Sequence, residues 1–254
     1  MSRVFVTGDT HDKDEYKKVE RLCAIAGTSK EDFLIVLGDH GVDFWGPKKD
    51  RPMKQYLESL PISFILVHGN HNQRPSKKLC QLTHVRTACV SGMFYVNPDY
   101  PSILYPKICG HYTILGEHAF IMGGAYSVDK PFRLAQQEMG DKRWRWFYDE
   151  QMTSQERFVC WQSLYAKPSY KYMFTHTCPL KYIPNPKLYP DADKTMETFF
   201  GEVQDTFQIE QWYCGHHHMD MWSLDRKLRF MYNDVILLGD TEDKGEETNE
   251  SESD

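Results

Sequence analysis

Short, largely apolar runs recur along this 254-residue chain and constrain its fold more than any other feature. They are rich in β-branched and aromatic residues, and glycine, histidine or aspartate follows each of them. Apolar runs of this length, without polar alternation, are typical of strands that are buried on both faces. We therefore expect buried strands at residues 4–7, 33–37, 62–67, 119–122, 170–175 and 211–214.

Helical patterns lie between these runs. Residues 14–26 place Val19 and Cys23 on one face, and residues 153–166 begin with a capping signal at Thr153 and a glutamate downstream. Shorter or similar patterns cover residues 54–60 and 193–207. Strands that alternate with helices indicate an α/β layered fold with much parallel pairing. Three later runs, at residues 93–96, 113–115 and 228–232, look like hairpin strands and predict some antiparallel pairs.

The composition limits where the protein works. The chain is 41% hydrophobic, which is enough for one large core, but no run approaches the roughly 18 to 20 apolar residues of a membrane span. Its first residues enter an apolar segment without the pattern of a secretory leader. The seven cysteines are scattered and include no CxxC pair, which favours a reducing compartment over a disulfide framework. We expect a cytoplasmic protein.

Acidic residues are concentrated at the C-terminus. The stretch from Asp240 to Asp254 holds eight acidic residues and one lysine, whereas the rest of the chain carries a net charge of about +1. A segment rich in Glu, Ser, Thr and Asn cannot bury enough apolar surface to fold. We therefore predict one domain over residues 1–238 and a disordered acidic tail over residues 239–254. The near-neutral body does not favour nucleic-acid binding, although a local basic groove stays open.

Metal-binding residue types follow five of the predicted strands. Ligand sites in open α/β sheets lie beyond the carboxyl ends of the strands, so these side chains are expected to meet at one edge. The Asp-x-His and His-x-His spacings put both side chains on one side of an extended chain, because the strand period is two. The residues are Asp9, His11, Asp39, Asn70, His71, His176, His216 and His218.

The chemistry of this set suits a pair of metal ions. A carboxylate such as Asp39 has two oxygens and is able to bridge two cations. Two cations held about 3.5–4 Å apart stabilise both the attacking and the leaving oxygen of a displacement at phosphorus. Mixed oxygen and nitrogen ligands suit Mn, Fe, Zn or Ni better than Mg or Ca. Any one of these motifs is weak alone, and only their ordered conjunction is specific.

In order and spacing, the motifs resemble those of the calcineurin-like metallophosphoesterase superfamily, from the first strand to about residue 220. The resemblance implies a four-layer α/β/β/α sandwich of two mixed β-sheets flanked by helices. It also implies two divalent transition-metal ions and attack on the ester by a metal-bridging hydroxide. The implied ligands are Asp9, His11 and His218 for the first ion, Asn70, His176 and His216 for the second, and Asp39 as the bridge.

The resemblance further implies that His71 is the general acid or a phosphate-contacting group. Many members carry an acidic residue directly after this histidine, but here Asn72 stands in that place. If Asn72 contacts His71, its amide would stabilise the imidazolium less than a carboxylate would. The arginine and the glutamate of the phosphoprotein-phosphatase branch are also missing, which disfavours protein dephosphorylation.

The segment after residue 122 bears on the substrate. Residues 123–130 resemble a segment of uncharacterised bacterial members of the superfamily, and Lys130 and Arg133 are candidates for binding phosphate oxygens. The alternative is a helix start, with Asp129 as its cap and Pro131 in its first turn. The aromatic cluster at residues 144–148 would either stack on a base or pack in a lid or core.

The prediction from sequence is therefore a two-metal-dependent phosphoesterase that hydrolyses a small or nucleotide-like phosphate ester, with manganese as the ion of choice in vitro. A metal-dependent nuclease or a cyclic-nucleotide phosphodiesterase is the alternative within the same chemistry. A non-catalytic metal-binding scaffold of the same fold is the alternative from another class. The sequence leaves the oligomeric state open.

Overall fold

The structure, a computed structural model, describes residues 2–240. Of the acidic tail predicted at residues 239–254, residues 241–254 lie outside the described residues. Within the described part, no helix is long and apolar enough to cross a membrane.

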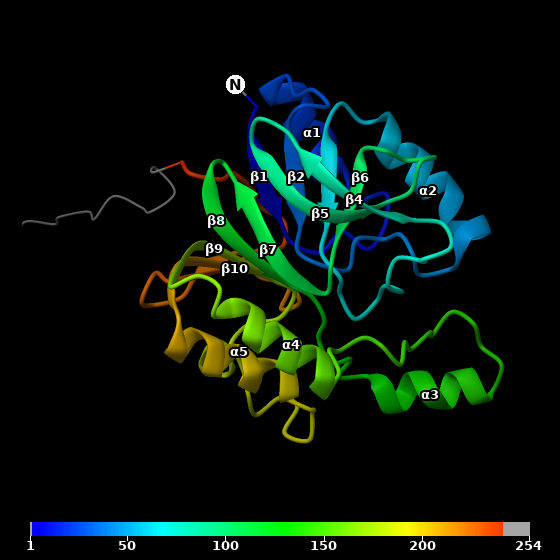
Figure 1. Ribbon diagram of the computed structural model, residues 1–254. Helices are drawn as coiled ribbons and strands as arrows, with labels where there is room; N and C mark the ends of the chain where they lie inside the picture. The colour runs from blue at the N-terminus through cyan, green and yellow to red at the C-terminus, as the bar shows by residue number, and fades with distance from the viewer. Residues whose placement is uncertain (1, 241–254) are drawn as a thin grey trace, which may run out of the picture.

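The N-terminal half is built on parallel strands, as the apolar runs predict. The strands β1, β2, β3 and β6 pair in parallel in that order, and β13 closes the edge antiparallel to β1. Two helices, α1 and α2, cover this half (Figure 1). The bounds are β1 Val4–Thr7, α1 Lys17–Ala26, β2 Phe33–Val36, α2 Pro47–Ser59, β3 Ser63–Leu66, β6 Ile103–Pro106 and β13 Val235–Leu237.

The helix α2 starts earlier than the predicted 54–60, and the reason is local. Pro47 occupies its first turn, where a missing N–H costs nothing. The carboxylate of Asp50 accepts the backbone N–H groups of Trp45 and Gly46 at 3.0 and 2.7 Å. These bonds satisfy donors that the helix start would otherwise leave free.

The C-terminal half repeats the pattern with different helices. The strands β8, β9, β10 and β12 pair in parallel, and β7 and β11 pair antiparallel with β8 and β12. The prediction that residues 228–232 form only a hairpin strand is therefore incomplete, because β12 also extends the parallel set. The bounds are β7 Cys109–Ile114, β8 Glu117–Met122, α4 Ser154–Leu164, β9 Ser169–Thr175, α5 Thr195–Thr206, β10 Gln208–Cys214, β11 Met221–Trp222 and β12 Leu228–Phe230.

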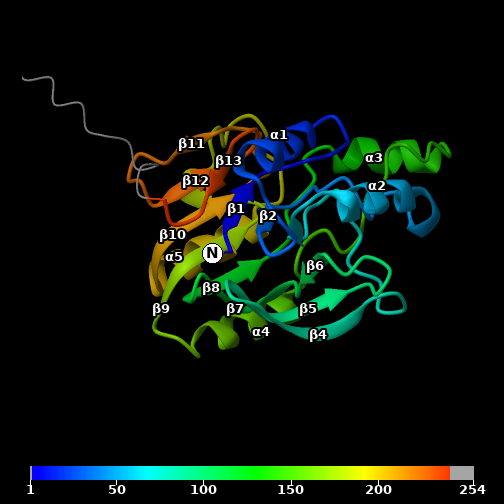
Figure 2. The same cartoon turned by 90° about the horizontal axis from the view of Figure 1, so that it is seen from above.

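One strand joins the two halves into a continuous sheet. The strand β5 (Val90–Val96) pairs with β6 through residues 94–96 and with β7 through residues 90–92. It also carries β4 (Gln81–Arg86) as an antiparallel neighbour. The expectation of two separate sheets is therefore not confirmed: the thirteen strands of the described residues form one curled sheet (Figure 2).

The curl gives the molecule three apolar layers. Between the two halves of the sheet lie side chains such as Val6, Ile35 and Phe174. Outside the first half, α1 and α2 both pack on the outer face of β1 to β3. Outside the second half, α4 and α5 pack on β8 to β10. Burial on both faces explains why the buried stretches of these strands are apolar at successive positions.

Two short elements lie beyond the sheet. The helix α3 (Lys130–Glu138) follows β8 and extends away from the rest of the molecule (Figure 1). It starts beside Asp129 with Pro131 in its first turn, as the helix-start alternative predicts, although the Asp129 side chain does not cap it. The 3-10 helix η1 (Leu180–Tyr182) precedes α5. The predicted capping of α4 is confirmed, with Thr153 and Glu156 bonding each other's backbone N–H groups.

Candidate metal centre

The loops that follow β1, β2, β3, β9 and β10 meet at one place. These strands are parallel to their neighbours within each half, and the curl brings the carboxyl ends of both halves together. Side chains from positions 9 to 218 are thereby brought within hydrogen-bond distance of one another. All eight of the histidine, aspartate and asparagine residues predicted from the motifs lie in this region.

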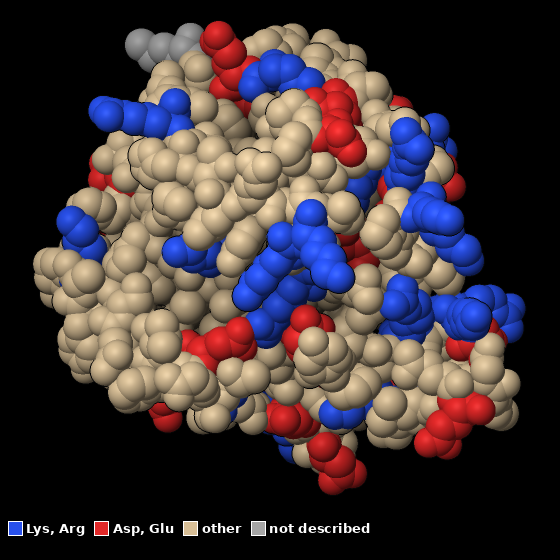
Figure 3. Space-filling view, turned by 45° about the vertical axis from the view of Figure 1, so that its right-hand side comes forward, with Lys and Arg blue, Asp and Glu red and all other residues tan. Residues whose placement is uncertain are grey.

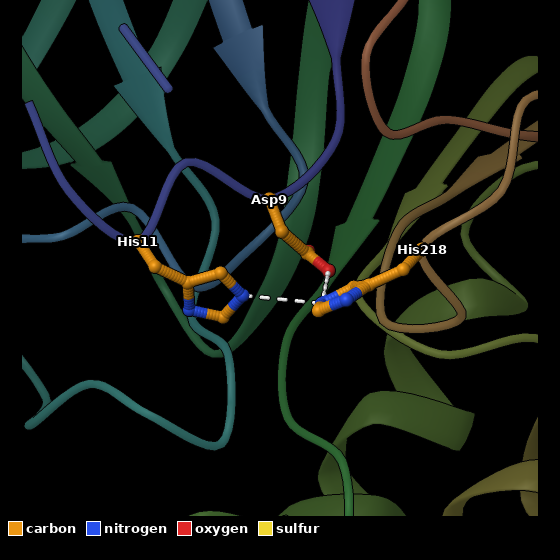
Figure 4. A group of neighbouring side chains, drawn as sticks. All are labelled: Asp9, His11 and His218. Carbon is orange, nitrogen blue, oxygen red and sulfur yellow. Dashed lines mark hydrogen bonds and ion pairs between the residues drawn. The ribbon is translucent and has the colours of Figure 1, made fainter. Parts of the chain in front are cut away.

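The first group consists of Asp9, His11 and His218 (Figure 4). The Nε2 atom of His218 lies 3.0 Å from Asp9 Oδ2 and 3.1 Å from His11 Nε2. Asp9 is fully buried, and its oxygens accept the backbone N–H of His216 at 3.1 and 3.2 Å. The ring of His218 stacks on Tyr232 with centroids 4.5 Å apart, which fixes its orientation.

The second group consists of Asn70, His176 and His216. The Nε2 atom of His176 lies 2.9 Å from Asn70 Oδ1, and its ring centroid is 4.9 Å from that of His216. The Nδ1 atom of His176 is 2.7 Å from the carbonyl oxygen of Leu37. Because a carbonyl only accepts, Nδ1 carries the proton in this bond. A bond of this kind fixes the ring so that Nε2 faces the site.

Asp39 lies between the two groups. Its Oδ2 atom is 3.5 Å from His176 Nε2 and 3.8 Å from His71 Nε2, and its Oδ1 atom accepts the backbone N–H of His71 at 2.8 Å. Possible ligand atoms of His11, Asp39 and His71 all lie within 4.8 Å of one another. Asp39 thus lies next to His176 of the second group and within 4.8 Å of His11 of the first.

Two glycines leave room for this packing: Gly38, which precedes Asp39 in the chain, and Gly69, which lies next to Asp39 in space. A β-carbon on Gly38 would lie 2.1 Å from His176 Nδ1, and one on Gly69 would lie 2.2 Å from Asp39 Oδ1. Asp39 itself has a positive φ of 44°. Backbone in this region is strained for a residue other than glycine, and such strain is concentrated at functional sites.

The charged groups of the site shift one another's pKa values. Burial alone would raise the pKa of Asp39, but the nearby His71 and His176 hold it well below its usual value. Burial opposes the charged form of His176, but Asp39 and Asp9 outweigh it and raise its pKa to about 9. Burial, and then the neighbouring His176, lower the pKa of His216. The carboxylates of Asp9 and Asp39 therefore favour a positively charged group beside them, as the raised pKa of His176 indicates.

Of the two basic residues predicted to contact substrate, the structure brings one to the site. Arg133 is buried, and its Nη2 atom lies 3.3 Å from His71 Nε2. Its Nε donates to Asp129 at 2.7 Å and its Nη1 to the carbonyl of Arg145 at 2.9 Å. Lys130 instead lies over the ring of Trp146, 4.2 Å from its centroid.

Asn72 does not take the place of an acidic partner for His71. Its Nδ2 donates to the carbonyl oxygen of Val42 at 2.8 Å. The groups that face His71 are Asp39 and Arg133, and burial together with the nearby Arg133 lowers the pKa of His71 although Asp39 opposes the change.

Three supporting residues escaped the sequence analysis. Asn70 Nδ2 donates to Ser127 Oγ at 3.0 Å, and Ser127 in turn donates to Glu150 Oε2 at 2.6 Å. Lys18 Nζ donates to the carbonyl oxygen of Asp9 at 2.9 Å. Ser127 lies in the glycine-rich segment after β8, which the sequence analysis had already connected with the substrate. Nothing in the sequence near Glu150 or Lys18 marks them.

The donors present fit divalent transition metals. Carboxylate oxygens, an amide oxygen and imidazole nitrogens converge, and most of their side chains are buried. Their ligand atoms approach one another to about 3 to 4 Å. Mixed oxygen and nitrogen donors of this kind are typical of Mn, Fe, Zn and Ni sites.

Comparison with known proteins identifies a family for this chain. Residues 2–220 match the calcineurin-like phosphoesterase family. Among curated proteins, none matches the sequence. Two solved structures are similar over 91% of this chain: a phosphopantetheinyl hydrolase from Mycobacterium tuberculosis (15% identity, 88% of that chain, TM-score 0.41) and GAP50, the anchor in the inner membrane complex of Plasmodium (10%, 71%, 0.47). The family match covers most of the folded chain, and the chain therefore belongs to the calcineurin-like phosphoesterases.

Proposed function

We propose that this protein uses two divalent metal ions to hydrolyse a small or nucleotide-like phosphate ester. Family membership supports metal-dependent phosphoester hydrolysis. The observation that carries the two-metal proposal is the position of Asp39, whose carboxylate faces both groups of potential ligands. We assign the ligands to Asp9, His11 and His218 for one ion and Asn70, His176 and His216 for the other, with Asp39 shared.

When bound, two such ions would neutralise the charge of the phosphate and lower the pKa of a water molecule so that it attacks at neutral pH. The protein itself would hold the metal ligands in position. Asn70 is held by Ser127, and His176 by the carbonyl of Leu37, so both keep their oxygen or nitrogen aimed into the site. Preorganised ligands of this kind avoid reorganisation during the reaction.

We assign proton transfer to His71. Its ring is partly exposed, with 26% of the side chain accessible, so it is able to reach a substrate. A neutral imidazole would need a proton from solvent before it could protonate a leaving oxygen, and burial and Arg133 favour that neutral form. Arg133, which lies 3.3 Å from His71, would bind a phosphate oxygen beside it.

A turnover screen tests this proposal directly. The protein is prepared with manganese, and in parallel with iron, zinc and nickel, and metal content is measured before assay. Phosphomonoesters, phosphodiesters, cyclic nucleotides, dinucleoside polyphosphates and short DNA and RNA are then compared. We expect metal-dependent hydrolysis of small esters and about two ions per chain. Cleavage of nucleic acid or cyclic nucleotides alone would favour the nuclease or phosphodiesterase alternative, and bound metal without turnover would favour a scaffold.

The charge of the surface supports a small substrate. Figure 3 shows basic and acidic side chains interspersed over one face, with a group of basic side chains near its centre. A nucleic-acid-binding surface usually carries a clear basic excess. We also propose a cytoplasmic location, since all seven cysteines are free thiols in the structure.

A further inference from the structure

A cavity of about 450 Å³ lies beside the metal centre. Its wall includes His216 and His218, so a group bound in it lies next to the proposed metal ligands. The rest of the wall is mainly apolar and comes from the segment after β8 and from the loop between η1 and α5. It includes Val128, Ile183, Leu188 and the rings of Tyr126 and Tyr189.

One carboxylate oxygen of this wall lacks a hydrogen-bond partner among the described residues. Glu197, in α5, is only 6% exposed. Its Oε1 atom accepts the hydroxyl of Thr177 at 2.8 Å, whereas its Oε2 atom is buried without a hydrogen-bond partner among the described residues. Leaving a buried carboxylate oxygen unsatisfied is costly, and such atoms in native proteins call for an explanation. A ligand that donates an N–H group would satisfy it.

We propose that this cavity binds the leaving group of the ester, and that the leaving group is a nucleoside whose base carries an exocyclic amino group. The inference rests on the proposed hydrolysis for its biological meaning. The base would stack on the tyrosine rings and donate its amino N–H to Glu197. Aromatic side chains that remain partly accessible, such as Tyr189 at 49% exposure, are suited to base stacking.

The charges of the cavity wall favour binding of the base there and disfavour binding of the phosphate. Asp193 and Glu197 both line the cavity, and Lys194 is the one lysine between residues 2 and 240 that does. A phosphate would be repelled by this pair of acids, whereas a neutral base with a donor group is accepted. A purely apolar leaving group would fill the cavity but leave Glu197 unsatisfied. The phosphate is instead expected near Arg133 and His71, outside this wall.

Binding of nucleosides to metal-free protein tests the inference without any turnover. Calorimetric titration compares adenosine, guanosine and cytidine with purine riboside, which lacks the amino group, and with ribose. We expect at least one amino nucleoside to bind about tenfold or more tightly than purine riboside, as a hydrogen bond to a charged group implies. Binding of ribose should be weaker still. Equal affinities for all five compounds, or no binding, would overturn the proposal.

Variants assign the affinity to residues. Glu197→Gln retains the size of the side chain and an acceptor for Thr177. It should weaken the binding of amino nucleosides about tenfold and leave the affinity for purine riboside unchanged. Tyr189→Ala should weaken the binding of both the amino nucleosides and purine riboside about tenfold. Tyr148→Ala, which removes an 87% exposed ring that does not line the cavity, serves as the matched control and should change neither. Equal losses in the control would overturn the assignment.

A separate assay separates this inference from the proposed function. Hydrolysis of phenyl phosphate is measured with manganese-loaded protein. Hydrolysis without nucleoside binding would overturn the nucleoside site and leave the phosphoesterase proposal standing. Nucleoside binding without hydrolysis of any ester would overturn the proposed reaction while supporting the nucleoside site.

Discussion

At the scale of single residues, Asp39 is the side chain on which the two groups of potential ligands depend. Its carboxylate is almost fully buried and faces His71 and His176. Asp39→Asn keeps the shape but removes the charge that two cations would share, so we expect turnover to fall more than about a hundredfold, as for loss of a key electrostatic group. Metal content should fall with it.

Elemental analysis and turnover of the purified variant check this expectation. Asp99→Asn, at an exposed position of the β5–β6 connection, is the control and should behave as wild type. Full metal occupancy and normal turnover in Asp39→Asn would contradict the shared-ligand assignment.

His71 is expected to differ from the ligands in its effect. Its Nε2 atom lies farther from Asp39 than that of His176 does, at 3.8 Å against 3.5 Å, and its side chain is partly exposed. We therefore predict that His71→Ala lowers turnover by about a hundredfold or more, in the range of lost acid–base catalysis, while both ions stay bound. If elemental analysis finds the site empty in His71→Ala, then His71 is a ligand rather than a proton donor.

The sequence located these residues because each motif directly follows an apolar strand. It did not reveal the bonds that hold them, such as Ser127 to Asn70 or Lys18 to the Asp9 carbonyl, because these partners are brought together only by the fold. It also offered Lys130 and Arg133 as equals, although only Arg133 reaches His71. Packing decides the direction of a side chain at the start of a helix. The sequence pattern does not predict that direction.

At the scale of elements, the tight turn after β2 positions both Asp39 and His176. Gly38 has a φ of +95°, and a β-carbon there would lie 2.1 Å from His176 Nδ1. Gly116 has a similar φ of +83° but nothing within 4 Å. Gly38→Ala should therefore combine backbone strain with displacement of His176, whereas Gly116→Ala should show only the strain, about 1 to 2 kcal/mol.

Chemical unfolding and metal titration compare the two variants. We expect Gly38→Ala to be the less stable and to bind metal at least about tenfold more weakly, because the position of a ligand changes. Gly116→Ala should retain the wild-type metal affinity. Equal stability and equal affinity in the two variants would show that the His176 contact is not restrictive.

A second element-scale prediction concerns the start of β2. Asp32 accepts hydrogen bonds from the Arg3 guanidinium, from the Arg3 backbone and from Ser29, and above all the Arg3 bond lowers its pKa to about 2. A carboxylate with a depressed pKa in the folded state stabilises that state above its unfolded pKa near 3.8. This contribution, about 2 kcal/mol, is lost as the pH falls from about 4 to about 2.

Unfolding free energies of wild type and Asp32→Asn measured across this pH range test the assignment. The difference between the two proteins should be largest above pH 5 and shrink as the pH approaches 2. A difference that does not vary with pH would mean that Asp32 acts through its shape alone.

Among the elements, most strands that contain a long apolar run were predicted within a few residues, whereas β4, β6, β11 and β13 were missed. Nearly all side chains of β4 are exposed, so its sequence carries no apolar run or alternation. The strand β5, which joins the two halves, was predicted only in part, because its pairing with β6 and β7 changes partway along its length. A single strand with two partners explains why one curled sheet replaces the expected pair.

At the scale of the whole molecule, the net charge of −6 comes from the C-terminal end of the chain. Residues 241–254 contain seven acidic residues and one lysine, so a chain that ends at Asp240 has a net charge of about zero. We propose that these residues do not contribute to the catalytic domain, since their composition does not support a packed core. Their removal should leave turnover, metal content and the free energy of unfolding unchanged within about 0.5 kcal/mol.

The same truncation should lower solubility, because a protein near zero net charge repels its own copies less. Light scattering at increasing protein concentration, at neutral pH and low salt, measures this effect. A control that replaces the seven acidic residues with their amides tests whether charge alone is responsible, and it should reproduce the loss of solubility. A large loss of turnover on truncation would instead mean that residues 241–254 support the metal centre, and the domain boundary predicted near residue 238 would be wrong.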